Sequence, residues 1–348
     1  MTVQMAFQNQ SAICTKAGAP FTGRLCRLVG QRLTGDTVIG RRILDWQGNP
    51  SHEGDALPLR LIGGLHALAR DGRRADWSAI YPPHQAPDET LWAMLHTVLE
   101  DEATFLEPWL DGPPQTNEVG RSAALMAGLL VLADHYGLPF ETYELGASAG
   151  LNSLLDRYHH DLAGVTAGDD KSAVRLKPEW TGSPLPKGHA EISARHLVDL
   201  NPLDPADEGT RKKLEAYVWA DQQDRLARLQ AALDIAAAQA LCVDAGDAAD
   251  WLEAHLALEP APGLCRVVMH TIAYQYFPPQ TQARIRRHIE AAGALAHRDA
   301  PLAWLSFEQS ERGGSERRPL LEVTTWPGGQ THTLARCQPH GALIEWLA

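Results

Sequence analysis

Apolar residues recur at helical spacing through the first third of the chain. Three segments place them three or four positions apart, with polar, proline-rich stretches between: residues 21–32, 59–69 and 89–99. A further segment, residues 122–136, is strongly apolar and is followed by Gly137 and Pro139, which are typical of helix ends. We therefore expect residues 1–137 to form a helical domain that covers and shapes a substrate pocket.

Strand-like segments begin after residue 137. Residues 140–145 form a short predicted strand, and after a turn residues 151–159 read as a helix. Further strands are expected over 194–200, 240–244, 265–270 and 301–307, and helices over 211–240, 248–258 and 281–296. The last two segments, 320–326 and 331–337, flank a Pro-Gly-Gly turn and are typical of an antiparallel pair.

This alternation predicts an α/β fold for residues 138–348. Strands that alternate with helices build a mostly parallel, Rossmann-like sheet covered on both faces, here with an antiparallel C-terminal edge. A stretch rich in glycine, proline and charge, at about residues 161–190, is expected to be an insertion. The predicted architecture is thus a Rossmann-like cofactor-binding domain preceded by a helical domain.

Composition and charge narrow the class of protein. The 348 residues carry a formal charge of −12, which argues against a surface that follows nucleic-acid phosphates. The N-terminus lacks the pattern of a signal peptide, and no apolar run is long enough to cross a membrane, so we expect a cytoplasmic protein. The cysteines are scattered and form no CxxC pair, and the run His159, His160, Asp161 has no matching ligands nearby. No metal is therefore expected.

The segment ELGASAGLN, residues 144–152, is the main candidate for a binding site. It joins a predicted strand directly to a helix, where small residues allow a ligand to approach the backbone and free N–H groups can bind it. In open α/β sheets, ligands bind at the carboxyl ends of the strands, which is where this segment lies. Its glycines, Gly146 and Gly150, are expected to leave room for the ligand.

Two alternatives to the leading hypothesis described next remain open for this loop, and a third function is disfavoured. A dinucleotide fingerprint is disfavoured because Ser148 and Leu151 occupy glycine positions. The pattern GASAG satisfies GxSxG, so Ser148 would be a hydrolase nucleophile, with Asp244 or Asp247 and His270 or His340 as its partners. A binding protein that retained the fold without chemistry is the second alternative.

S-adenosylmethionine (SAM) binding is the leading hypothesis. Such a loop has an acid two residues before its first glycine, and Glu144 meets that requirement. Asp199 ends the next long predicted strand, where a carboxylate suits a ribose diol, and Asp247 follows the strand after that, placed to accept from an adenine amino group. The expected cofactor-binding residues are Glu144, Gly146, Ala147, Ser148, Gly150, Asn152, Asp199, Leu200, Asp247 and Ala248.

Several motifs resemble known families. The loop, the segments DLNPLDP and AGDA, and the strand VVMHTIAYQY together look like the core of class I SAM-dependent methyltransferases. The chain more closely resembles the bacterial DUF2332 family, through QTNEVGRSAAL, ELGASAGLNSLLDRY, DLNPLDP, HTIAYQYFP and CQPHGALIEWL, which are spread over about two-thirds of its length. The resemblance implies a class I methyltransferase-type fold that binds SAM.

The chemistry of the remaining polar residues completes the hypothesis. His270 ends an apolar strand and is the candidate general base, with Tyr274 beside it as a second catalytic candidate. Asn117, Glu118 and Arg121 precede an apolar helix and are the candidate substrate contacts, unless they only cap that helix. The methyl acceptor would be a small molecule or a protein side chain, and neither nucleic acid nor a membrane is an expected partner.

Overall fold

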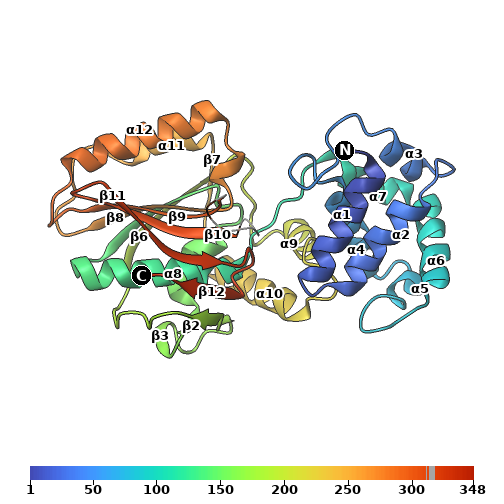
Figure 1. The fold of residues 1–348 in the computed structure, drawn as a ribbon, viewed down its shortest axis with the longest axis horizontal. Coiled ribbons are helices and arrows are strands. Elements are labelled where there is room, and N and C mark those ends of the chain that lie inside the picture. The colour runs from blue at the N-terminus through green and yellow to red at the C-terminus, as the bar shows by residue number, and fades with distance from the viewer. Residues whose placement is uncertain (311, 313–317) are drawn as a thin grey trace. The chain divides into compact units, whose positions relative to one another are not determined.

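The computed structural model describes residues 1–310, 312 and 318–348 (Figure 1). The chain folds as two compact units. The first unit comprises residues 1–116 together with 208–227, and the second comprises 117–207 together with 228–348. The expected division lay at residue 137. In the structure, the apolar helix 122–136 instead belongs to the second unit, and the later segment 208–227 belongs to the first unit.

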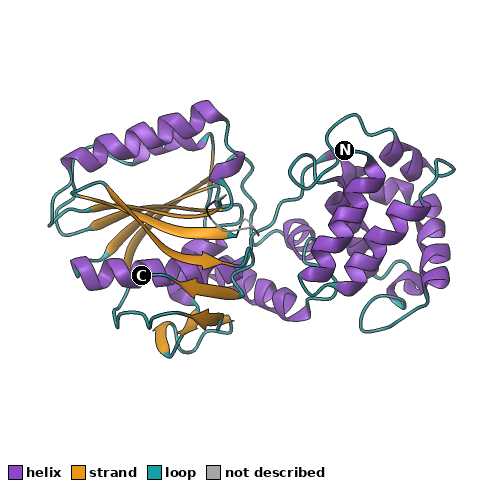
Figure 2. Cartoon of the chain, in the orientation of Figure 1, coloured by secondary structure: helices purple, strands orange, loops and turns teal. Residues whose placement is uncertain are grey.

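The first unit is built from helices (Figure 2). They are α1 (Val3–Lys16), α2 (Pro20–Arg32), α3 (Val38–Leu44), α4 (Leu57–Asp71), α5 (Ala75–Ser78), α6 (Asp88–Asp101), α7 (Ala103–Asp111) and α9 (Glu208–Ala216). Their apolar faces enclose one core that contains Phe7, Leu25, Leu61, Trp77 and Leu95, all at most 1% exposed. The expected N-terminal helical region is thereby confirmed.

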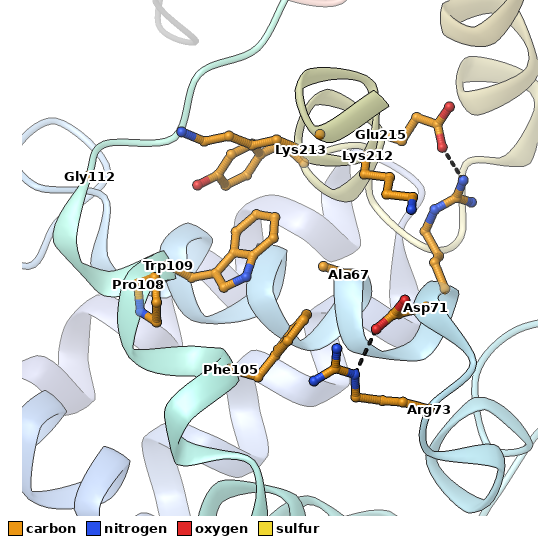
Figure 3. Close-up of a pocket in the computed structure, with 13 residues that line it drawn as sticks. Ala67, Asp71, Arg73, Phe105, Pro108, Trp109, Gly112, Lys212, Lys213 and Glu215 are labelled. Atoms are coloured by element: carbon orange, nitrogen blue, oxygen red, sulfur yellow. Dashed lines mark hydrogen bonds and ion pairs between the residues drawn. The ribbon is translucent and has the colours of Figure 1, made fainter. Parts of the chain in front are cut away.

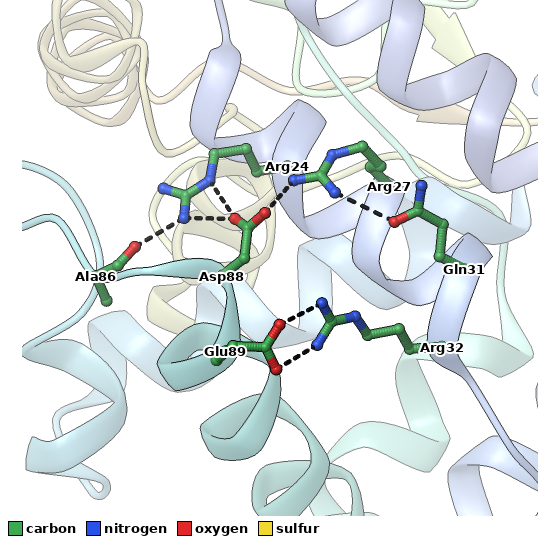
Figure 4. Close-up of polar contacts among 7 residues, drawn as sticks. All are labelled: Arg24, Arg27, Gln31, Arg32, Ala86, Asp88 and Glu89. Atoms are coloured by element: carbon green, nitrogen blue, oxygen red, sulfur yellow. Dashed lines mark hydrogen bonds and ion pairs between the residues drawn. The ribbon is translucent and has the colours of Figure 1, made fainter.

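Ion pairs connect α2 to the start of α6 (Figure 4). The carboxylate of Asp88 accepts from Arg24 at 2.8 Å and from Arg27 at 2.7 Å, and Arg32 binds Glu89 through both of its terminal nitrogens. Both acids lie in the first turn of α6, where the helix dipole favours negative charge. Because these groups are exposed to solvent, which screens their charges, each pair contributes little to stability.

Asp221 explains why a late segment of the chain belongs to the first unit. Its carboxylate accepts from the backbone N–H of Phe21 at 2.7 Å, and from the N–H and hydroxyl of Thr22 at 3.0 and 2.7 Å. It therefore satisfies N–H groups in the first turn of α2 that no residue of α2 can reach. Nearby, Arg70 of α4 is paired with Glu215 of α9.

Over the residues that the structure describes, the second unit contains a nine-stranded mixed sheet. Its strands are β1 (Phe140–Leu145), β5 (Glu179–Thr181), β6 (Ile192–Asp199), β7 (Asp244–Ala245), β8 (Cys265–Thr271), β9 (Leu302–Gln309), β10 (Pro319–Trp326), β11 (Gln330–Cys337) and β12 (Leu343–Trp346). Their spatial order is β5-β12-β11-β10-β9-β8-β1-β6-β7. The run from β9 to β7 is parallel throughout, and the strand order reverses between β1 and β8.

The antiparallel C-terminal part is present, but it is not the sheet edge. Strands β10 and β11 form the expected antiparallel pair, and β9 and β12 pair antiparallel to them on either side. The outermost strand is β5, which comes from the predicted insertion and pairs with β12 in parallel. The insertion also contributes a small sheet in the order β3-β2-β4, from β2 (His159–Leu162), β3 (Val165–Gly168) and β4 (Arg175–Leu176).

Helices cover both faces of the large sheet (Figure 1). On one face lies α8 (Ser122–Tyr136), whose Gly128 allows close approach, because a Cβ there would lie 2.6 Å from Leu305 Cδ1 of β9. On the other face lie α11 (Ala248–His255) and α12 (Pro279–Leu295). Both helices contribute to a core with Leu145, Val198 and Val268 of the central strands.

Two predicted helices differ from the structure. The helix expected over 211–240 is broken into α9 and α10 (Gln223–Ala238), because the consecutive bulky residues 217–219 disfavour helix, and Tyr217 and Val218 are buried instead. The helix expected over 151–159 is the 3-10 segment η2 (Leu151–Arg157), and the residues after it enter β2.

Candidate functional site

The carboxyl ends of β1 and β6 hold the candidate loop. The backbone N–H groups of Gly146 and Ala147 both donate to Val198 O of β6, at 2.9 and 3.0 Å. The backbone has positive φ at Gly146, Ser148 and Gly150, with values of 70°, 57° and 73°. This conformation favours glycine, so the non-glycine Ser148 is a strained position of the kind found near functional sites.

Asp199, the last residue of β6, binds the middle of the loop. One of its carboxylate oxygens accepts from the N–H of Ser148 at 2.8 Å, and the other accepts from the N–H of Asn201 at 2.8 Å. The next residue, Leu200, is 72% exposed, which is unusual for a large apolar side chain. The acid expected at the end of this strand therefore lies against the candidate loop, with an apolar surface beside it.

Glu144 of β1 is the most perturbed acid at this edge. Its side chain is 2% exposed, and its Oε2 has no hydrogen-bond partner among the described residues. Burial, and then the negative charge of Asp199, raise the pKa of Glu144 to about 8, against the lowering effect of the Ser153 N–H. Glu144 is therefore largely protonated at neutral pH.

The two loop glycines serve the packing of the protein itself. A Cβ at Gly146 would lie 2.6 Å from Ala273 Cβ, and one at Gly150 would lie 2.7 Å from Leu241 Cδ2. The space next to these glycines is therefore filled by other side chains of the chain. Our expectation that Gly146 and Gly150 leave room for a ligand is not met in this conformation.

Residues just before and at the start of α8 hold the candidate loop in place through hydrogen bonds. Asn117 Oδ1 accepts from the N–H of Leu151 at 2.9 Å, and the hydroxyl of Ser122 donates to Asn152 Oδ1 at 2.8 Å. Asn152 Nδ2 reaches Thr271 Oγ1 at 3.4 Å. Asn117 and Asn152, expected at substrate and cofactor, thus connect α8, the loop and the end of β8 to one another.

Arg121 and Glu118 also make contacts within the protein. Arg121 donates to Thr271 O at 3.1 Å and to Pro339 O at 3.0 Å, while Glu118 Oε1 accepts from the N–H of Gly120 at 2.9 Å. A Cβ on Gly120 would lie 2.2 Å from His340 O, so the C-terminal turn is packed directly on this segment. This contact was not predicted from the sequence, where its only indication is a glycine in the segment before α8 and another in the C-terminal turn.

His270 lies at the end of β8 with both ring nitrogens bonded. Nδ1 lies 2.7 Å from Glu308 Oε1, and the indole N–H of Trp304 donates to Nε2 at 2.9 Å. Because the indole can only donate, Nε2 must accept, so the ring is uncharged and donates from Nδ1. A role as general base would require one of these two bonds to open.

The loop after β8 is strained and polar. Ile272 has a φ of 46°, which is rare for a β-branched residue, and its N–H donates to Phe307 O at 2.7 Å. Tyr274 stacks on His270, with ring centres 4.9 Å apart, and its hydroxyl donates to Gln282 O. Ser148 and Ile272 thus place two strained residues in the loops that follow adjacent strands.

Asp247 is the N-cap of α11. Its Oδ1 accepts from the N–H groups of Ala249 and Asp250, at 2.9 and 3.2 Å, and its Oδ2 accepts from the Thr281 hydroxyl. Ala248 is the buried first residue of the helix. Capping alone accounts for these contacts, so the expected adenine contact would have to replace one of them.

The hydrolase alternative lacks its catalytic partner in this structure. Ser148 Oγ is buried and has no hydrogen-bond partner among the described residues, and His270 is bonded to Glu308 and Trp304 instead. Asp244 accepts from the indole of Trp251 at 2.8 Å. In the described part of the chain, no group of three or more His, Cys, Asp or Glu side chains is arranged to hold a metal ion.

The fold and site define a mixed α/β protein with a helical unit and an acidic pair at the carboxyl ends of the adjacent parallel strands β1 and β6. The chain belongs to the DUF2332 family, described as an uncharacterized protein conserved in bacteria, which matches residues 4–346. The resemblance to this family is thereby confirmed. No curated protein and no solved structure matches the chain.

None of the helices in the described ranges combines the length and the apolar character needed to span a membrane.

Proposed function

We propose that the second unit binds SAM at the edge formed by β1 and β6, and that the protein transfers its methyl group to a small molecule or a protein side chain. The observation that carries this proposal is the buried Glu144 Oε2, which has no partner and lies beside Asp199. An unpaired buried oxygen is costly, and a bound cation or hydroxyl donor would remove that cost.

The topology supports this location. The parallel strands have the order β7-β6-β1-β8-β9, which in sequence order of those strands is 3-2-1-4-5. Doubly wound, Rossmann-like folds of this order bind their ligands outside the carboxyl ends of the strands, where the order reverses. Glu144 and the loop after it lie on the β1 side of that reversal.

The chemistry of the edge suits the two polar parts of SAM. The methionine ammonium would face Glu144, and the ribose hydroxyls would compete for Asp199, whose present partners are backbone N–H groups. Exposed Leu200 offers an apolar surface for the adenine ring. Methyl transfer itself requires little beyond orientation, so the protein would act mainly by positioning the two reactants.

A cation beside Glu144 would also lower its pKa. Binding would then release a proton, since Glu144 is largely protonated near pH 7 in the free protein. The apparent binding enthalpy would therefore depend on the ionisation enthalpy of the buffer. This dependence separates a ligand at Glu144 from one bound elsewhere on the protein.

Isothermal titration of the full chain with SAM and with S-adenosylhomocysteine tests the proposal. We expect micromolar binding, lost in Glu144→Ala and weakened in Asp199→Asn, while Asp134→Ala on the exposed side of α8 binds normally. A thermal melt of each variant verifies that it is folded. Normal binding by folded Glu144→Ala, or no binding of either compound by the folded wild type, would refute the assignment; the second result favours a binding protein without this chemistry.

Ser148 supports one alternative, a serine hydrolase. Its Oγ is free of hydrogen bonds within the described chain, and its φ is positive. Labelling by a fluorophosphonate probe that disappears in Ser148→Ala would establish this activity. Absence of labelling in the folded wild-type protein would remove it.

A further inference from the structure

We propose that the first unit contains a second ligand site, for a small anion with a flat aromatic body. The site is a cavity of about 590 Å³ between α4, α7 and the α9 segment (Figure 3). All of its lining residues belong to the first unit. Its volume lies within the range of pockets that bind small molecules. The inference does not depend on SAM binding by the second unit.

Two aromatic side chains form a preorganised wall. The rings of Trp109 and Tyr217 meet edge to face, with centres 5.5 Å apart. Two consecutive glycines of α4 leave room for these rings. A Cβ on Gly63 would lie 2.6 Å from Tyr217 Cε1, and one on Gly64 would lie 2.9 Å from Trp109 Cγ. The rings therefore pack against the helix backbone. Such fixed aromatic surfaces bind planar rings with little loss of side-chain entropy.

The third aromatic residue, Phe105, lies under a cation. The guanidinium of Arg73 stands 4.6 Å from the centre of the Phe105 ring, and its Nε is paired with Asp71 at 2.7 Å. Figure 3 shows Phe105 of α7, Asp71 at the end of α4 and Arg73 just after α4 gathered on one side of the cavity. An aromatic surface and a positive charge thus occur side by side, which is the combination that an aromatic anion requires.

The lining is more basic than the chain as a whole. Four basic side chains face two acidic ones, in a protein whose formal charge is −12. Arg70 is paired with Glu215, Arg73 with Asp71, and Lys212 with Glu208 at 2.7 Å. Lys213 has no ion pair among the described residues. Its ammonium is therefore available to a carboxylate, sulfonate or phosphate group.

Two fluorescent dyes provide a matched test with the full-length protein. Anilinonaphthalene sulfonate has a planar aromatic body and one negative charge, whereas N-phenylnaphthylamine has the same rings without the charge. We expect one saturable site for the sulfonate and much weaker binding of the neutral dye. Naphthalene sulfonate should displace the bound dye, because it carries the same two features.

Substitutions locate the dye. Lys213→Ala should weaken sulfonate binding about five-fold, as expected for one partly exposed charge pair, and leave the neutral dye unaffected. Lys171→Ala, which removes an exposed lysine from the second unit, is the control and should change nothing. Trp109→Phe should weaken both dyes, because it reduces the aromatic wall without removing it.

The outcomes separate this site from the proposed SAM site. Equal affinity for both dyes, or sulfonate binding unchanged in both Lys213→Ala and Trp109→Phe, would overturn the inference. Lys213→Ala is an exposed substitution that should fold normally, so its result remains interpretable if Trp109→Phe is unstable. SAM titration of the same variants should be unaffected, whichever way the dye experiment ends.

Discussion

Glu308 of β9 accepts a hydrogen bond from His270 of β8 at 2.7 Å, using an oxygen that also receives the N–H groups of Ala273 and Tyr274. One carboxylate oxygen thereby fixes the imidazole tautomer and the start of the loop after β8. The indole of Trp304 completes the arrangement from the other side of the ring. In this structure His270 acts as a buried structural connection between two strands.

Replacing His270 with alanine should therefore destabilise the second unit. The substitution leaves the Trp304 N–H and the Glu308 carboxylate without their partner in a buried environment, at a cost of about 2–4 kcal/mol. Urea unfolding followed by circular dichroism measures the change. His297→Ala, at an exposed position, is the control and should cost less than about 0.5 kcal/mol. A His270→Ala protein as stable as its control would show that these bonds do not form.

Stability should decrease as the pH rises through neutrality because of Glu144. Its pKa is raised from 4.5 to about 8 on folding, so between these values the folded chain binds more protons than the unfolded chain. The free energy of unfolding then falls with pH, by up to about 1.4 kcal/mol per pH unit. This stabilisation is complete below pH 4.5 and lost once the pH passes about 8.

Glu144→Gln isolates this effect, since the amide keeps the shape of the side chain and does not titrate. Its unfolding free energy should vary less with pH than that of the wild type, and it should exceed the wild type above pH 8. Glu179→Gln, at an exposed position of β5, serves as the control. A pH dependence that is identical in Glu144→Gln and the wild type would mean that Glu144 is ionised in the folded protein.

Gly120→Ala should destabilise the second unit by about 1–3 kcal/mol, because a new methyl group must be accommodated in a filled space. The Cβ would lie 2.2 Å from the backbone oxygen of His340, which cannot rotate away. Gly112→Ala is a matched control: its Cβ would meet nothing within 4 Å, and its φ of −114° suits alanine. Melting temperatures of the two variants measure the difference, and equal values would contradict the tight contact.

Asp221→Ala should selectively destabilise the first unit. The substitution removes three hydrogen bonds from the start of α2, two of them from backbone N–H groups, at a cost of about 2–3 kcal/mol. Glu100→Ala removes an exposed acid from α6 and should have little effect. Hydrogen exchange of α2 amides should increase in the first variant alone. Unchanged protection of these amides would refute the capping role.

Local sequence patterns located most elements because those elements depend on nearby residues. The apolar run 122–136 coincides with α8, and the predicted strand 265–270 differs from β8 by one residue. Periodicity contains no information about partners distant in the chain. Periodicity therefore did not predict that residues 208–227 belong to the first unit, which depends on Asp221. It also did not predict that β5 forms the edge of the large sheet.

The site was predicted in part for the same reason. Residues of the strand ends, Glu144 and Asp199, lie close together because adjacent parallel strands end at one edge, which topology alone dictates. The bonding of individual side chains depends on three-dimensional contacts that spacing does not reveal. Asn117, His270 and Asp247 looked available in the sequence and are each bonded within the protein.

The division of the first unit between two stretches of sequence has a consequence for synthesis. Its N-terminal stretch ends at residue 116, but the cap of α2 and the aromatic ring of Tyr217 arrive about a hundred residues later. On the ribosome, the helices made first must therefore wait, with part of their apolar surface uncovered, until residue 227 has left the exit tunnel. A gene fragment that stops at residue 116 would encode an incomplete core, prone to aggregation, rather than an independent domain.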